Sequence, residues 1–184
     1  MAELPTMLRL LSAACFVTIS YLSGLRAGEV LNLRRGCAGQ DPLTRELLLY
    51  GRLGKGYDRL PVADGEAVPQ RPWVVVTPVH AAIAVLEQIV GGELLFPASL
   101  ARAGSRRSAG EQARASHSVN VDLEDFITWV NQSFPGPDGG AAIPPDPAGH
   151  IYASRFRRTL AYFIVRRPAA SSRPRCNTRT STPK

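Results

Sequence analysis

The first 33 residues are predominantly apolar and predict two consecutive helices. From Pro5 to Ser23 the chain is apolar almost all round, which is typical of a buried helix. Proline suits the first turn of such a helix, and Gly24 suits the left-handed backbone conformation that often ends one. A short second helix is predicted over residues 27–33.

Short apolar runs separated by glycine predict a small β-sheet. Residues 47–50 and 59–62 flank a glycine-rich turn that carries Lys55, so we expect them to form a β-hairpin. Residues 73–76 predict a third strand because they combine tryptophan with three valines.

The second half of the chain predicts three more helices. Apolar residues recur at helical spacing from Pro78 to Gly91. Residues 97–118 are polar and contain four arginines, so we expect a long loop. The next helix has an apolar face formed by Val121, Phe126, Ile127 and Val130. After a connector rich in proline and glycine, the last helix covers Ser154 to Arg167, with an apolar stripe formed by Phe156, Leu160, Phe163 and Ile164.

Length and composition predict one domain. The chain has 184 residues, of which 45% are hydrophobic, and this allows a single packed core. We expect that domain to span residues 1–167. Residues 168–184 contain no valine, leucine, isoleucine or aromatic side chain, so they predict a disordered basic tail. The expected fold class is mainly α with a small antiparallel β-sheet (α+β).

Charge gives only a weak indication of function. The formal net charge is +7 with a pI near 9.9, which favours an anionic partner such as nucleic acid. However, six basic and no acidic residues lie between Arg166 and Lys184, which leaves a balance of +1 for the rest of the chain. Net charge alone therefore does not establish a DNA-binding surface.

Cysteine usage and the N-terminal run bear on localisation. The three cysteines include no CxxC pair, which indicates neither a disulfide framework nor a zinc site and fits a reducing cytoplasm. The apolar run contains Arg9, and the residues before it include Glu3 and no basic side chain. We therefore expect a buried helix rather than a signal peptide or membrane span, in a cytoplasmic protein without membrane contact.

Three basic residues are candidates for phosphate chemistry. Arg26 lies between two predicted helices, Lys55 lies at the tip of the predicted hairpin, and Arg157 lies at the edge of an apolar stripe. Two guanidinium groups could hold the non-bridging oxygens of a phosphodiester without metal, and a lysine could protonate the departing oxygen. Each residue also has a simpler interpretation: Arg26 could pair with Glu29, Lys55 could be a solvated turn residue, and Arg157 could neutralise a carboxylate at the core edge.

Four segments resemble the catalytic domain of tyrosine recombinases (phage integrases). YLSGLRAGEVLNLRRGC is similar to the first conserved box of that family, and LLLYGRLGKGYDR resembles the hairpin with its catalytic lysine. WVVVTPVHAAIAVLE resembles the strand and helix that follow, and SRFRRTLAYFI resembles the second conserved box. The resemblance implies catalytic roles for Arg26, Lys55 and Arg157, with Glu29 supporting the turn at Arg26.

The chain also departs from the family pattern. Ser154 stands where the second box usually has histidine. The family's Leu-Gly-His motif and nucleophilic tyrosine do not follow this box, and no nucleophile is found, since Tyr162 lies on the same predicted helix as Arg157. There is also little sequence before Arg26 for the family's core-binding domain.

The resemblance implies a DNA recombination or integration protein that acts on double-stranded DNA without metal or nucleotide cofactor. The missing tyrosine predicts that this polypeptide does not cut DNA alone, although a partner recombinase subunit could donate a tyrosine. The alternatives are a non-catalytic DNA-binding remnant and a decayed gene product without a role. A less favoured hypothesis is a membrane-associated protein with a basic tail.

Overall fold

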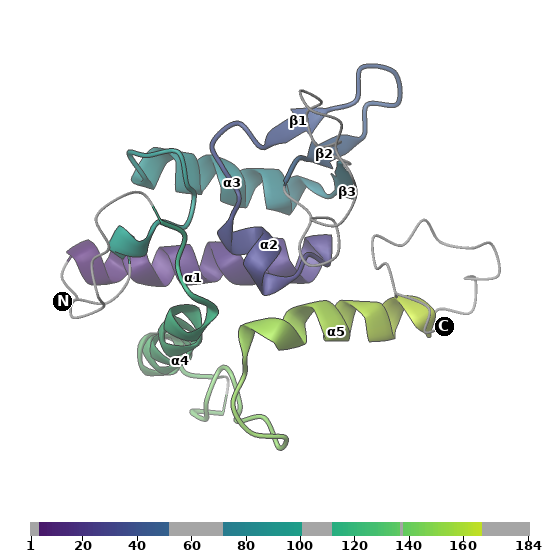
Figure 1. Cartoon of the computed structure of the whole chain (residues 1–184). Coiled ribbons are helices and arrows are strands. Elements are labelled where there is room, and N and C mark those ends of the chain that lie inside the picture. The colour runs from purple at the N-terminus through teal and green to yellow at the C-terminus, as the bar shows by residue number, and fades with distance from the viewer. Residues whose placement is uncertain (1–3, 52–71, 101–111, 137, 167–184) are drawn as a thin grey trace, which may run out of the picture.

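The computed structural model describes residues 4–51, 72–100, 112–136 and 138–166, and over these it is mainly helical with one small antiparallel sheet (Figure 1). This is the predicted α+β class. The elements in chain order are α1 (Leu4–Ser23), α2 (Ala27–Leu31), β1 (Ala38–Gln40), β2 (Leu47–Leu49), β3 (Trp73–Val75), α3 (Thr77–Ile89), the 3-10 helix η1 (Ala98–Leu100), α4 (Ser116–Ser133) and α5 (Ala153–Val165).

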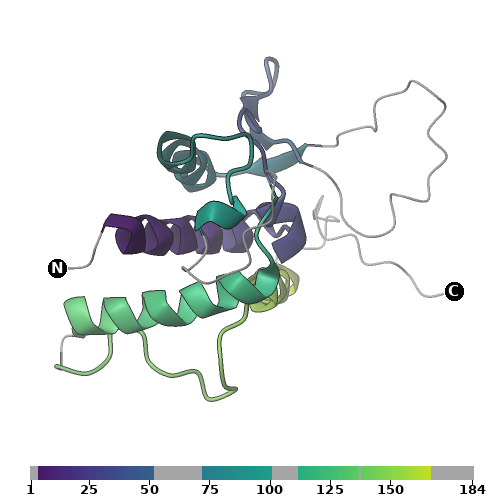
Figure 2. The same cartoon turned by 60° about the vertical axis from the view of Figure 1, so that its left-hand side comes forward.

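Helix α1 lies at the centre and contacts α3, α4 and α5. Figure 1 shows α3 on one side of it with α4 and α5 on the other, and Figure 2 shows α4 lying alongside α1. Phe16 and Ile19 are fully buried, and the Phe16 ring meets Phe96 and Phe156 edge to face. By length and composition α1 is also apolar enough to cross a membrane; in this structure 44% of that apolar stretch is buried, and Cys15, Phe16 and Ile19 belong to the hydrophobic core.

The sheet has the strand order β1-β2-β3, with both pairs antiparallel. Two of its strands agree with the predicted ones, since β2 lies within residues 47–50 and β3 within residues 73–76. Strand β1 was not predicted. It pairs with β2 from Ala38 opposite Leu49 to Gln40 opposite Leu47. The expected hairpin partner at 59–62 and its turn with Lys55 lie outside the described residues.

The predicted helices around the core are confirmed with small shifts of their ends. Helix α1 is followed by Gly24 with a φ of +69°, as its position predicted. Helix α2 ends at Leu31, two residues earlier than expected, and α3 begins beside Pro78 as predicted.

The prediction of a long loop over residues 97–118 is wrong at both ends. Helix η1 forms at its start, and α4 already begins at Ser116. Arg114 is only 5% exposed, because its guanidinium donates to the buried carboxylate of Asp122. A polar segment can enter the core when its charges are paired and hydrogen-bonded in this way.

The buried face of α4 also differs from the predicted one. Val119, Asp122 and Leu123 are its fully buried residues, whereas Val121 and Ile127 are only partly covered. The apolar pattern predicted the wrong face because one of the three buried positions of α4 holds a charged residue, Asp122. Arg9 of α1 donates to the same carboxylate at 2.6 Å.

Helix α5 forms where the last helix was predicted, but its stripe is covered only in part. Ala153 is buried and Phe156 packs against the core, whereas Phe163 is 55% exposed. Figure 1 shows the reason, since the last turns of α5 extend beyond the end of α1. The predicted basic tail, residues 168–184, lies outside the described residues.

Candidate functional site

The turn between α1 and α2 places Arg26 at the start of α2. Gly24 reverses the chain with its positive φ, and the Ser23 hydroxyl accepts a hydrogen bond from the backbone N–H of Leu25 at 3.2 Å. The Leu25 side chain is fully buried, so it anchors the turn in the core. The backbone of Arg26 is therefore held at a defined position by this turn.

Glu29 holds Arg26 at two points. Its carboxylate accepts the backbone N–H of Arg26 at 2.7 Å and the Nη1 of the same residue at 2.9 Å. The Glu29 side chain is 5% exposed and that of Arg26 is 47% exposed. The predicted pairing of Arg26 with Glu29 is therefore present, and it orients a guanidinium that still reaches solvent.

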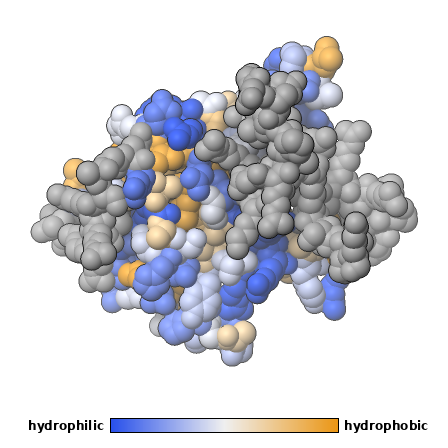
Figure 3. All heavy atoms as spheres, in the orientation of Figure 1, coloured by the Kyte–Doolittle hydropathy of each residue, from blue (hydrophilic) through white to orange (hydrophobic). Residues whose placement is uncertain are grey.

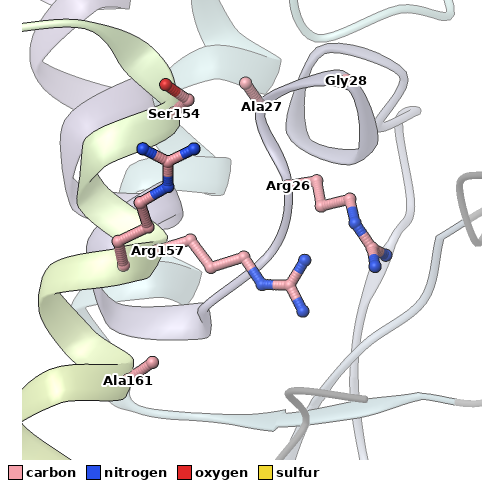
Figure 4. Close-up of a pocket in the computed structure, with 7 residues that line it drawn as sticks. Arg26, Ala27, Gly28, Ser154, Arg157 and Ala161 are labelled. Carbon is pink, nitrogen blue, oxygen red and sulfur yellow. The ribbon is translucent and has the colours of Figure 1, made fainter. Parts of the chain in front are cut away.

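Helix α5 brings Arg157 to the same place. A pocket of about 480 Å³ lies between the start of α2 and the first half of α5. Its lining residues are Arg26, Ala27, Gly28, Ser154, Arg157, Arg158 and Ala161. Figure 4 shows side chains from these two elements on facing walls, with Arg26 on one and Arg157 on the other.

Of the five site residues predicted from sequence, the structure gathers four. Arg26, Ser154 and Arg157 line the pocket, and Glu29 lies buried behind Arg26. The fifth, Lys55, lies outside the described residues.

Arg158 is a basic pocket residue that was not among the candidates predicted from the sequence. It lines the same pocket and is exposed. The signal was available in the helical spacing, because Arg157 and Arg158 lie three and four residues after Ser154 on α5. Figure 3 shows strongly hydrophilic residues over α5 on this side of the molecule.

The arrangement suits an oxyanion. Three arginines from two separate elements line one pocket, and Glu29, the carboxylate paired with Arg26, is buried rather than facing solvent. One guanidinium group can bind two oxygens of a phosphate or carboxylate at once, through two parallel hydrogen bonds of fixed geometry. None of the described tyrosines (Tyr21, Tyr50, Tyr152 and Tyr162) is among the lining residues.

No protein-family model, curated protein or solved structure matches the chain. The resemblance to tyrosine recombinases therefore rests on the four quoted segments. The geometry of the pocket is a separate observation, because it joins the first and last of those segments in space.

Proposed function

We propose that this protein binds a phosphodiester group of double-stranded DNA in the pocket between α2 and α5, as a tyrosine-recombinase-like protein that does not cut DNA alone. The observation that carries the proposal is that Arg26 and Arg157 line the same pocket. These residues come from nearly opposite ends of the described chain, yet they line one pocket. They are also the two arginines that the resemblance assigns to phosphate binding.

The contacts around Arg26 support this proposal. Because Glu29 holds both its backbone and its Nη1, the guanidinium loses little conformational freedom when it binds an anion. Arg157 is partly buried and Arg158 is exposed, and both line the wall opposite Arg26. A phosphodiester has two non-bridging oxygens, and guanidinium groups on facing walls can bind one each.

The position of Tyr162 supports the proposal that the protein does not cut DNA alone. Tyr162 belongs to α5, but it does not line the pocket, although its neighbour Ala161 does. The Tyr162 ring instead packs under the Arg166 guanidinium, 4.4 Å from the ring centre. This tyrosine is therefore not placed to attack a phosphate in the pocket.

Salt-dependent DNA binding tests the phosphate site. Fluorescence anisotropy with a labelled duplex should show log affinity falling linearly with log salt. Arg26→Ala and Arg157→Ala should each reduce that slope by about 0.9, the value for one lost phosphate contact. Arg34→Ala is the matched control, because it removes the same charge from an exposed residue outside the pocket. Equal slopes for all three variants would contradict the proposal.

A second experiment tests the absence of cutting. The protein is incubated with a nicked duplex suicide substrate, and a denaturing gel is used to detect a covalent protein–DNA adduct. We expect a salt-sensitive complex without an adduct. An adduct would show that a nucleophile reaches the bound phosphate, and peptide mapping would identify it.

A further inference from the structure

The first turn of α5 is capped by a side chain from another helix. Tyr152 precedes the helix and makes no side-chain capping hydrogen bond. The backbone N–H of Ala153 instead donates to Oδ1 of Asn120, on α4, at 3.0 Å. Amides in the first turn of a helix have no partner within the helix, so such a bond fixes where the helix begins.

Asn120 is itself held on a rigid support. Its neighbour Val119 is buried in the core. Asp122, two residues after Asn120 on α4, binds Arg9 of α1 through its carboxylate. Ala153 is 2% exposed, so the acceptor and the donor meet at the edge of the packed interior. Asn120 thereby links the start of α5 to the α1–α4 pair.

The position of this link matters for the pocket. Ser154 directly follows the capped residue, and Arg157 lies one helical turn after it. The other hydrogen bonds of this turn lead outward to the connector, where Arg155 pairs with Asp146 and donates to the carbonyl of His150. The hydrogen bond that Asn120 accepts instead ties this turn directly to α4.

We propose that Asn120 is a positioning residue for the phosphate site, which holds the first turn of α5 so that Arg157 faces Arg26. This assignment rests on the proposed binding of a DNA phosphate in that pocket. Asn120 does not line the pocket, and it acts through the backbone of Ala153.

The test compares Asn120→Ala with Asn120→Asp in the duplex-binding assay. Loss of one hydrogen bond that orients Arg157 should weaken binding roughly fivefold and lower the salt slope toward that of Arg157→Ala. Asn120→Asp should restore both quantities, because a carboxylate oxygen accepts the same N–H and suits a helix N-terminus. If Asn120→Ala does not fold, Asn120→Gln replaces it, since it displaces the amide by one methylene.

Asn131→Ala is the matched control. Asn131 also lies on α4 and exchanges two hydrogen bonds with the backbone of Ile143, but it does not contact α5 through them. We expect this variant to lose stability without a change in salt slope. An equal loss of slope in both alanine variants would overturn the positioning role.

A double-mutant cycle separates this inference from the proposed function. If Asn120 acts through Arg157, the double variant Asn120→Ala/Arg157→Ala should bind DNA as Arg157→Ala does. Additive losses would overturn the assignment of Asn120 alone. If Arg157→Ala binds like the unmodified protein, the phosphate site itself is wrong, and the role of Asn120 at that site is overturned with it.

Discussion

Replacing Asp122 by alanine should strongly destabilise the protein, because this carboxylate serves two arginines. It accepts from Arg9 at 2.6 Å and from the buried guanidinium of Arg114. Asp122 and the Arg114 side chain are each 1% exposed, and Arg9 is 12% exposed. The network joins α1 to α4 and to Arg114, which lies just before α4 in the chain.

The magnitude follows from what the substitution leaves behind. Arg9 keeps Asp125 at 2.6 Å, but Arg114 keeps only the hydroxyl of Ser118 among its described side-chain partners. Burial and the nearby charge of Arg9 lower the pKa of Arg114 to about 10, so it still carries its charge at neutral pH. An uncompensated buried charge of this kind costs about 3–5 kcal/mol. For a chain of this size, that corresponds to a fall in Tm of roughly 6–20 °C.

Urea denaturation followed by circular dichroism measures the effect. Asp125→Ala provides the comparison, because Asp125 is 34% exposed and shares the same Arg9. Its loss should cost less than about 1 kcal/mol, as for other solvent-exposed ion pairs. The reasoning would be refuted by equal losses for the two variants, or by a loss below about 1 kcal/mol for Asp122→Ala.

Two further predictions concern the α1–α2 turn and the cysteines. Gly24→Ala should lower the free energy of unfolding by roughly 1–2 kcal/mol, because φ is +69° and the new Cβ would lie 3.2 Å from Leu160. Gly28→Ala should not lower it, because Gly28 lies in a helix and has open space around its Cβ. Urea titration of both variants checks this, and an unchanged Gly24→Ala would contradict it. Burial raises the pKa of Cys15 to about 11 and that of Cys37 to about 12, so both should resist iodoacetamide at pH 8 in the native protein and react in urea. Peptide mass spectrometry gives the extent of modification at each cysteine, and rapid native labelling would show that these thiols are accessible.

Local sequence patterns predicted the elements whose signals are local. The nearly uniform apolar run gave α1, the glycine after it gave the left-handed turn, and helical spacing after Pro78 gave α3. These features depend on residues within a few positions of one another, so no knowledge of the tertiary structure was needed.

The parts that failed depend on distant partners. Strand β1 has the sequence Ala-Gly-Gln, which lacks an apolar alternation and forms a strand because β2 pairs with it. Arg114 looked like a loop residue because its partner Asp122 is recognised only in space. Phe163 looked like a core residue, but α5 extends past the helix that would have covered it.

The candidate site shows the same division. Residue chemistry and the family resemblance singled out Arg26, Glu29, Ser154 and Arg157, but neither could show that they lie together. That grouping depends on how α5 packs against α1, with Leu160 lying close to Gly24. Arg158 was missed because its helical spacing from Ser154 becomes informative only once Ser154 is known to line the pocket.

The central position of α1 has a consequence for synthesis. This helix leaves the ribosome well before one of its covering helices, α5, which begins only at Ala153. At ordinary rates of translation, its apolar surface waits on the order of ten seconds for that last partner. The nascent chain can therefore complete this core only after α5 has been made, and during that interval α1 is a natural binding site for chaperones that hold apolar segments.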